Sequence, residues 1–350
     1  MSIQTYLAAV PKAELHVHLE GSILPSTLLT LAKRNGIELP ATTVEGLREL
    51  FAFRDFDHFI EIYGIISRCL KTNEDFETIA YEFGAEMARQ HALYAEVTFT
   101  PSFHHHHGHP DNLFLDGLER GRQRAQQEFG VEIRWVFDII RNVSDPALNA
   151  KYADYTTSLA IECMERGVIS LGLGGGEAGY PPEPFEPYFT RARAAGLHSD
   201  PHAGEVAGPE SVWGALRWLG AERIGHGVRS IEDPELVAYL AEHQVPIEVN
   251  PTSNICLGVY PNLGAHPLRR LYEAGVPLSV NSDDPPLFNT TLNDEVMLLA
   301  GEFDFDIATI DDILLNGVRH SFLPAEEKDA LERRFREEMA ALKVEIKGKG

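Results

Sequence analysis

Short apolar runs rich in β-branched residues recur along the chain and alternate with longer segments of helical periodicity. Eight such runs predict strands, at residues 13–19, 94–100, 131–139, 168–174, 197–204, 222–227, 245–251 and 276–284. The helical candidates between them include 182–196, 208–220, 233–244 and 266–275. An eightfold alternation of strand and helix predicts an α/β fold, a (β/α)8 TIM barrel. A doubly wound sheet ranks second, because no G-x-G-x-x-G follows the first strand.

The connection between the first two predicted strands is longer than one crossover helix requires. Residues 21–92 contain several helical segments, and the segment 56–72 places apolar side chains on a single face. These side chains are Phe56, Phe59, Ile60, Tyr63 and Ile66. We expect a helical insertion that decorates the barrel, covers its mouth as a lid, or does both. Residues 1–350 are predicted to form one barrel domain with a solvated helical tail at about 323–350.

Composition narrows the class of protein. The 350 residues include 44% hydrophobic residues, and the formal net charge is -23. So acidic a chain is a poor ligand for nucleic acid or an anionic membrane surface, and neither is expected as a partner. Three scattered cysteines suit a reducing compartment, and the N-terminal residues resemble no signal peptide. Because no stretch is long enough to span a bilayer, we expect a soluble cytoplasmic protein.

Histidines and acidic residues lie where several predicted strands end. His16 and His18 share one face of the first strand, because alternate strand residues point the same way. His202, His226 and Asp283 follow on strands five, six and eight. In a barrel the carboxyl ends of the strands meet at one face. Three of these four imidazoles and the carboxylate, with one position left for water, match a catalytic zinc-type site.

Four segments, "PKAELHVHLEGS", "HAGE", "RIGHG" and "VNSDDP", occur in this order. Together they resemble the adenosine deaminase family of the amidohydrolase superfamily, from about residue 11 to about residue 300. Adenosine, adenine and aminodeoxyfutalosine deaminases belong to this family. The resemblance implies a metal-dependent hydrolase with one zinc per chain, held by His16, His18, His202 and Asp283. Such an enzyme acts on a cyclic amidine: water replaces the 6-amino group of a purine and ammonia leaves.

The resemblance implies roles for further residues beside the metal ligands, and a catalytic role for Asp283. Glu205 would protonate purine N1, and His226 would orient or deprotonate the attacking water. Asp284 would hydrogen-bond N7, and the backbone N–H of Gly175 would face N3. Protonation of N1 requires a carboxyl group that stays protonated, as a dry site provides.

Other chemistries fit the residues less well. Many superfamily relatives hold two metals through a modified lysine on strand four, but here that strand ends "LGLGGGEAG". The H-x-E and P-C-x-x-C signature of other zinc deaminases is absent, as is the G-x-S-x-G elbow of serine hydrolases. A barrel that binds purine nucleosides without turnover would need neither an acid nor a base, so Glu205 and His226 disfavour it.

Fewer residues bear on the identity of the substrate. Adenosine deaminases commonly carry Asp where this chain has Glu20, the residue expected at the ribose 5′-hydroxyl. Adenine deaminases and members that act on 5′-modified adenosines tend to carry Glu. The continuation "PLFNTTLNDEV" is closer to that of nucleoside deaminases. We expect adenosine or a 5′-modified adenosine, such as 6-aminodeoxyfutalosine in menaquinone biosynthesis, with adenine as the alternative.

The segment 102–110, "SFHHHHGHP", follows the second strand and should lie near the barrel mouth. Neighbouring residues of a loop cannot all reach one ion, so His104–His107 are interpreted as solvated loop residues. A less favoured alternative is that one or two of these imidazoles, or Arg141, meet a substrate carboxylate.

Overall fold

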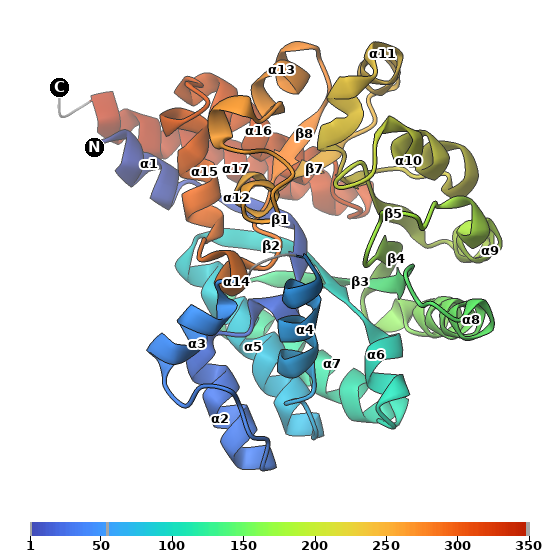
Figure 1. Cartoon of the computed structure of the whole chain (residues 1–350). Coiled ribbons are helices and arrows are strands. Elements are labelled where there is room, and N and C mark those ends of the chain that lie inside the picture. The colour runs from blue at the N-terminus through green and yellow to red at the C-terminus, as the bar shows by residue number, and fades with distance from the viewer. Residues whose placement is uncertain (1, 54–55, 348–350) are drawn as a thin grey trace.

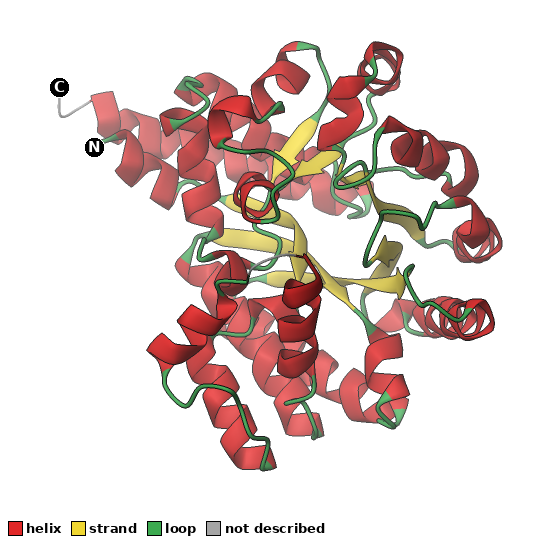
Figure 2. Cartoon of the chain, viewed as in Figure 1, coloured by secondary structure: helices red, strands yellow, loops and turns green. Residues whose placement is uncertain are grey.

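The molecule is described by a computed structural model over residues 2–53 and 56–347. Eight parallel strands form one sheet in the order β1 to β8, surrounded by helices (Figures 1 and 2). The strands are β1 (Lys12–His18), β2 (Ala92–Phe99), β3 (Glu132–Ile140), β4 (Val168–Gly174), β5 (His198–Ala203), β6 (Ile224–His226), β7 (Ile247–Val249) and β8 (Leu278–Val280). The predicted α/β barrel is therefore confirmed.

The α-helices are α1 (Ile3–Ala9), α2 (Pro25–Asn35), α3 (Val44–Phe51), α4 (Phe56–Ser67), α5 (Asn73–Arg89), α6 (Pro101–His106), α7 (Asp111–Phe129), α8 (Pro146–Glu162), α9 (Glu186–Ala195), α10 (Pro209–Gly214), α11 (Pro234–His243), α12 (Pro251–Cys256), α13 (Leu268–Glu273), α14 (Pro285–Phe288), α15 (Leu292–Gly301), α16 (Ile307–Arg319) and α17 (Ala325–Lys347). The short turns are η1 (Glu20–Ser22), η2 (Met164–Arg166), η3 (Glu183–Phe185), η4 (Ala215–Leu219), η5 (Val228–Glu232) and η6 (Leu263–Ala265). None of the helices in the described ranges has the length and apolar character needed to cross a membrane.

The barrel closes where the last strand, β8, lies beside the first strand, β1. Asp283, just beyond β8, donates its backbone N–H to the His16 carbonyl at 3.0 Å, and its carbonyl accepts from the His18 N–H at 2.9 Å. Deeper in the barrel, the Asn281 side chain accepts from the Leu15 N–H at 2.9 Å. These bonds place Asp283 beside the two histidines of β1 before any metal is considered.

The segment between β1 and β2 folds as η1 and helices α2 to α5. In Figure 1, α4 lies in front of the strands rather than in the outer ring of helices. Phe59 and Ile66 are buried, whereas Ile60 is 40% exposed and Tyr63 is half-buried. The side chain of Phe56, also expected on this face, lies outside the described residues. One face of α4 therefore packs inward over the barrel.

The C-terminal helix differs from the expectation of a solvated tail. Phe335 and Met339 on α17 are buried in the hydrophobic core. The helix packs against α16, and only its remaining faces carry the charged residues that suggested a solvated segment. Phe335 and Met339 are spaced by four residues and therefore share one face of the helix. The many charged residues around them obscured this apolar face in the sequence.

A buried guanidinium holds several strands together below the barrel mouth. Arg223, just before β6, contacts the carboxylates of Glu96 on β2, Asp200 on β5 and Glu248 on β7. All four side chains are almost inaccessible to solvent. Burial raises the pKa of Asp200 and of Glu248 to about 7, while the Arg223 charge opposes that shift. Three acidic groups therefore depend on one cation at this depth.

We predict that Arg223→Met lowers the free energy of unfolding by about 3–5 kcal/mol, because it leaves buried carboxylates without their cation. Urea denaturation followed by circular dichroism measures the change. Arg191→Met is the matched control, since Arg191 pairs with Asp154 at an exposed position and should contribute about 0–1 kcal/mol. Equal losses in the two variants would contradict a structural role for the buried cluster.

Candidate active site

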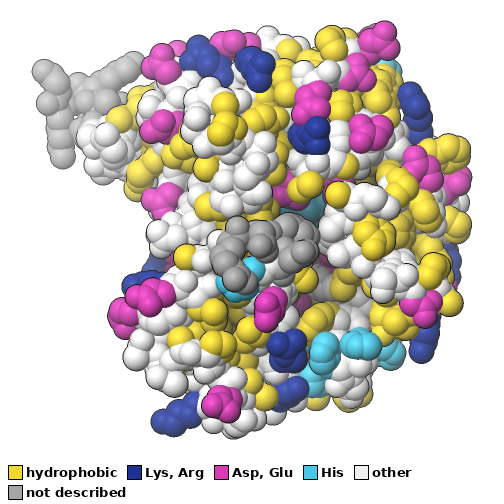
Figure 3. All heavy atoms as spheres, in the orientation of Figure 1, with side chains coloured by type: hydrophobic (Ala, Val, Ile, Leu, Met, Phe, Trp, Pro, Cys, Tyr) yellow, Lys and Arg dark blue, Asp and Glu magenta, His cyan; other side chains and the backbone are white. Residues whose placement is uncertain are grey.

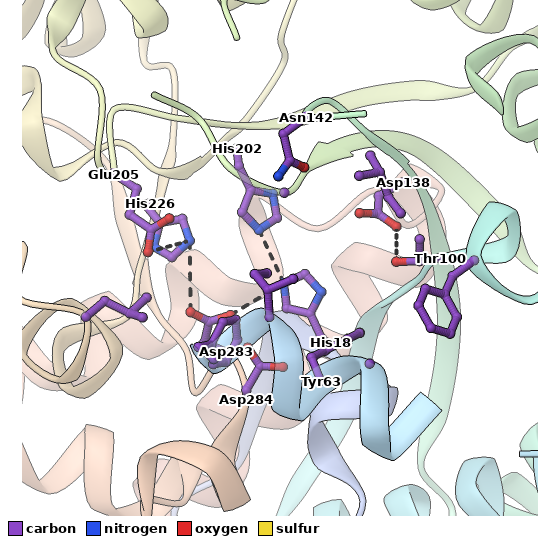
Figure 4. A pocket seen from close by; sticks show the side chains of 17 residues that line it. His18, Tyr63, Thr100, Asp138, Asn142, His202, Glu205, His226, Asp283 and Asp284 are labelled. Carbon is purple, nitrogen blue, oxygen red and sulfur yellow. Dashed lines mark hydrogen bonds and ion pairs between the residues drawn. The ribbon is translucent and has the colours of Figure 1, made fainter. Parts of the chain in front are cut away.

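Donor atoms from three strand ends converge at the carboxyl-terminal end of the barrel (Figure 4). His18 Nε2 lies 3.3 Å from His202 Nε2 and 3.4 Å from the Asp283 Oδ1 atom. His16 Nε2 lies 3.8 Å from the same Asp283 oxygen. The structure thus brings together all four residues that the sequence proposed as metal ligands.

These separations suit a zinc ion. Four ligands at about 2.1 Å from a tetrahedral ion stand about 3.4 Å apart, close to the distances between these atoms. Burial lowers the pKa of His16 to about 4 and that of His202 well below its usual value, so both rings are neutral. His16 Nε2 is buried and has no hydrogen-bond partner among the described residues. Neutral imidazoles with an unused lone pair are the form that binds metal.

Glu248 on β7 sets the orientation of His16. Its Oε2 atom lies 2.7 Å from His16 Nδ1, so the ring donates its Nδ1 proton to the carboxylate and turns the Nε2 lone pair toward the other donors. Arg223 holds the second oxygen of the same carboxylate. Sequence reasoning missed Glu248, although an acidic residue inside the apolar strand "VPIEVNP" is a signal of this kind.

A chain of hydrogen bonds assigns the tautomer of His226. His266 Nδ1 accepts from the Leu268 N–H at 3.2 Å, so His266 Nε2 donates to Asn254 Oδ1 at 3.0 Å. The Asn254 amide group therefore faces His226 Nδ1, at 3.4 Å, and the Asn250 amide approaches the same atom at 3.2 Å. With Nδ1 as the acceptor, His226 carries its proton on Nε2, which faces the site.

Two of the site residues adopt a backbone conformation that L-amino acids rarely use. His226 has φ of 61° and Asp283 has φ of 64°. Both occur where a short strand ends and the chain turns sharply toward the following loop. Strained positions of this kind concentrate at functional sites, where the surrounding structure holds them in place.

Glu205 lies in the loop after β5 and faces the same space. Its Oε1 atom stands 3.7 Å from His226 Nε2, and the residue is 8% exposed. Burial first, and then the charge of Asp283, raise the pKa of Glu205 well above its usual value. A carboxyl group in this environment keeps its proton at neutral pH and can act as an acid.

Asp283 and Asp284 differ in their surroundings. Burial raises the pKa of Asp283, but the facing imidazoles outweigh it and hold that pKa below its usual value. Burial and the neighbouring Asp283 raise the pKa of Asp284 well above its usual value. Asp284 packs against Gly21, where a Cβ atom would stand 1.6 Å from its Oδ1 atom. The glycine of "LEGS" is therefore required for Asp284 to reach the site.

A cavity open to solvent, with about 850 Å³ of empty space that includes its open mouth, lies directly above these groups. One end is polar and includes His18, His202, Glu205, Asp283 and Asp284 (Figure 4). Away from the metal ligands the walls are largely apolar, and the apolar lining residues are Phe59, Ile60, Phe103, Ile140 and Leu257. The residues from α4 form part of this wall, which places the helical insertion at the mouth of the site.

The wall at the ends of β2, β3 and β4 contains Gly175, which the sequence proposed, and three polar residues that sequence reasoning missed. Gly175, proposed to contact the substrate, lines the cavity with φ of 82°, and a Cβ atom there would stand 2.4 Å from Asn142 Oδ1. Asn142, Asp138 and Thr100 also line the cavity. Thr100 donates to Asp138 at 2.6 Å, and burial raises the pKa of Asp138 to about 6. An aspartate within the apolar strand "RWVFDII" was the available signal.

Glu20, expected at the ribose 5′-hydroxyl, is not among the described residues that line the cavity. It is fully buried behind Tyr63 of α4. Tyr63 donates its hydroxyl to Glu20 at 3.1 Å, and His104 Nε2 lies 2.9 Å from the other carboxylate oxygen. Tyr63 itself lines the cavity. Glu20 therefore contacts a residue of the cavity wall, Tyr63, and does not line the cavity itself.

The histidine run is not a solvated loop. Residues 101–106 form helix α6, and His104 is buried, stacked on Phe99 with ring centroids 5.0 Å apart. His106 contacts the Tyr152 hydroxyl, and His106 and His107 are the exposed members of the run, in the histidine patch over α6 (Figure 3). Pro101 at the first helical position favours the helix, a signal that the histidine repeat obscured.

Arg141 is not positioned to meet a ligand in this cavity. It is 1% exposed and donates its Nη1 proton to the His202 carbonyl at 2.9 Å. It lines a separate hollow formed with residues of α8 and the loop after β4. Arg141 thus supports the strand that carries His202. It does not meet a substrate carboxylate in this cavity, which was the less favoured interpretation of the sequence.

Comparisons with known proteins agree with this site. The profile of the family described as adenosine deaminase matches residues 11–338. The chain is 44% identical over 328 residues to an aminodeoxyfutalosine deaminase of Streptomyces coelicolor, covering 93% of this chain and 84% of that protein. It is also similar to the crystal structure of adenine deaminase from Arthrobacter aurescens, with 32% identity, a TM-score of 0.87, and coverage of 94% of this chain and 99% of the other.

A third relative is a crystal structure of an amidohydrolase from Burkhoderia ambifaria with bound Zn. It is 26% identical to this chain, with a TM-score of 0.88, and covers 99% of this chain and 96% of its own. Fold and site together define an amidohydrolase-type barrel with a candidate His/Asp metal centre. The chain belongs to the adenosine deaminase family, whose members are hydrolases of C–N bonds.

Proposed function

We propose that this protein removes the 6-amino group of a 5′-modified adenosine by hydrolysis, with aminodeoxyfutalosine as the favoured substrate. The observation that carries the proposal is the buried Glu205 carboxyl, 3.7 Å from His226 Nε2, at the polar end of the cavity. An acid and a hydrogen-bonding imidazole beside a metal centre match the needs of purine deamination.

We propose one zinc ion per chain, held by His16, His18, His202 and Asp283. The distances between these donors and their burial fit four ligands on one ion, to which a water molecule would be the fifth ligand. When bound, zinc lowers the pKa of water to about 7 and so supplies a nucleophile at neutral pH. His226 is left out of the ligand set, because its Nε2 carries a proton and offers no lone pair.

The chain's own residues divide the remaining work. Glu205 delivers its proton to purine N1, which makes C6 electrophilic. His226 directs its Nε2–H toward the attacking oxygen and orients it, a role that its tautomer favours over proton abstraction. Asp284 donates a hydrogen bond to N7, which carries no proton in a 9-substituted purine, and the Gly175 N–H faces N3. The pocket that encloses these groups limits water, which strengthens each hydrogen bond.

The preference for a modified 5′ end rests on two observations. The most polar part of the cavity lies at the metal centre, whereas the apolar residues from α4 and α6 offer contact area to a bulky 5′ group. The carboxylate of Glu20 is already engaged by Tyr63 and His104, so it is not free to hold a ribose hydroxyl. The 44% identity to an aminodeoxyfutalosine deaminase adds support. Adenine is the second candidate, because an adenine deaminase is also similar.

Purified protein is predicted to contain one equivalent of zinc, measured by inductively coupled plasma mass spectrometry. His16→Ala should lose the metal, because it removes a ligand. His226→Ala should retain it while turnover falls. Two equivalents in the unaltered protein, or none with full activity, would contradict the single-zinc proposal, and zinc loss in His226→Ala would make that residue a ligand.

Glu205→Gln is predicted to keep zinc and to bind purine nucleosides, but to lower kcat on the order of 10²- to 10⁴-fold, since it removes the proton donor while keeping the shape. Steady-state kinetics and a metal assay on the same preparation test this. Glu183→Gln, at an exposed position after β4, is the control and should leave kcat unchanged. A wild-type kcat in Glu205→Gln would remove Glu205 from the mechanism.

The substrate proposal predicts that kcat/KM for aminodeoxyfutalosine and 5′-methylthioadenosine equals or exceeds that for adenosine, and that adenine is a poor substrate. A pocket closed around a ribose hydroxyl would reject such substituents by steric clash. All four compounds are compared under one condition by release of ammonia. A strong preference for adenosine would refute the proposal that the 5′ side of the pocket is open. A preference for adenine would refute the proposal that the substrate is a nucleoside.

A further inference from the structure

The loop that carries Glu205 is bound by a second glutamate that none of the chemistry above uses. The N–H groups of four successive residues, 204 to 207, all point to the Glu177 carboxylate. The distances are 2.6 Å from Gly204 to Oε1, then 3.1, 2.8 and 2.8 Å from Glu205, Val206 and Ala207 to Oε2. Glu177 is 5% exposed.

This arrangement requires a particular backbone. Gly204 has φ of 70°, and a Cβ atom there would meet Val212 at 2.5 Å, so only glycine fits. The resulting turn directs successive N–H groups to one side and forms an anion-binding concavity that the Glu177 carboxylate fills. Hydrogen bonds from neutral donors to an ionised acceptor are the stronger kind. The loop is therefore fixed at four consecutive peptides, with Glu205 among them.

Glu177 has no direct route to the substrate. It is not among the described residues that line the cavity, although Gly175, two residues earlier, does line it. Arg229 makes further contacts to the loop, since its N–H donates to the Gly204 carbonyl at 2.9 Å. The loop thus has an anchor besides Glu177, and the fold does not depend on the glutamate alone.

We propose that Glu177 is a positioning residue of the deamination reaction, which holds the Glu205 carboxyl in place by binding the peptides around it. The inference rests on the proposed function, because positioning matters only if Glu205 transfers a proton. It connects strand β4, through the end of "LGLGGGE", to the acid that follows β5. Reacting groups displaced by about 1 Å lose rate by up to about 100-fold.

The first test needs no activity. Amide hydrogen exchange is measured by mass spectrometry on the unaltered protein, Glu177→Gln and the control Glu183→Gln, with peptides covering 203–208. Because Val206 is 39% exposed, protection of its amide depends on the bond to Glu177. We expect exchange at 204–207 to quicken at least tenfold in Glu177→Gln and to stay unchanged in the control. Unchanged exchange in Glu177→Gln would overturn the proposal.

The second test is a double-mutant cycle in kcat with Glu205→Gln. Glu177→Gln alone should lower kcat by about 10- to 100-fold with zinc retained and KM within about threefold. In the Glu205→Gln background the same change should cost less than twofold, because there is no longer an acid to position. Equal losses in both backgrounds would show a merely structural role and overturn the proposal.

The two hypotheses fail in different ways. A wild-type rate in Glu205→Gln would refute the role of Glu205 as the acid. Faster amide exchange in Glu177→Gln would still show that Glu177 binds the loop at 204–207. If Glu177→Gln does not fold, Glu177→Asp replaces it. That variant keeps the charge but withdraws the carboxylate by one methylene, and smaller changes in the same directions are expected.

Discussion

The contact of Arg223 with three buried carboxylates is the interaction on which the rest of the site depends. It joins β2, β5 and β7 to the start of β6, and through Glu248 it reaches His16 on β1. The orientation of a proposed metal ligand is thereby tied to the packing of strands far apart in sequence.

The histidines and Asp283 above that cluster are explained by their position as one group of metal-type donors. Burial keeps His16 and His202 neutral, because it lowers the pKa of both rings, and Asp283 is a buried carboxylate in the same group of donors. A buried carboxylate among neutral rings carries an uncompensated charge, which a divalent ion would balance. The positive φ values of His226 and Asp283 are consistent with this, since strained residues persist where the surroundings over-determine them.

The polar end of the cavity and its apolar walls come from different parts of the chain. The polar end of the cavity is built from strand ends, whose positions the barrel hydrogen bonds determine. The opposite walls come from α4 and α6, which meet behind the cavity through the Glu20, Tyr63 and His104 side chains. This buried triad links the insertion to the barrel. Changes in the insertion can therefore alter the apolar walls of the cavity without disturbing the proposed metal ligands.

The sequence by itself determined the barrel, the order of its strands and the donors at their ends, because periodicity and strand-end position are local properties. It did not reveal that the histidine run is helical, that α17 buries Phe335 and Met339, or that Arg141 supports His202. Nor did it identify Glu248 or Glu177, whose partners are 232 residues away and about 28 residues away. Only the tertiary structure decides such pairs, since burial and hydrogen bonding depend on which distant segments the closed barrel brings together.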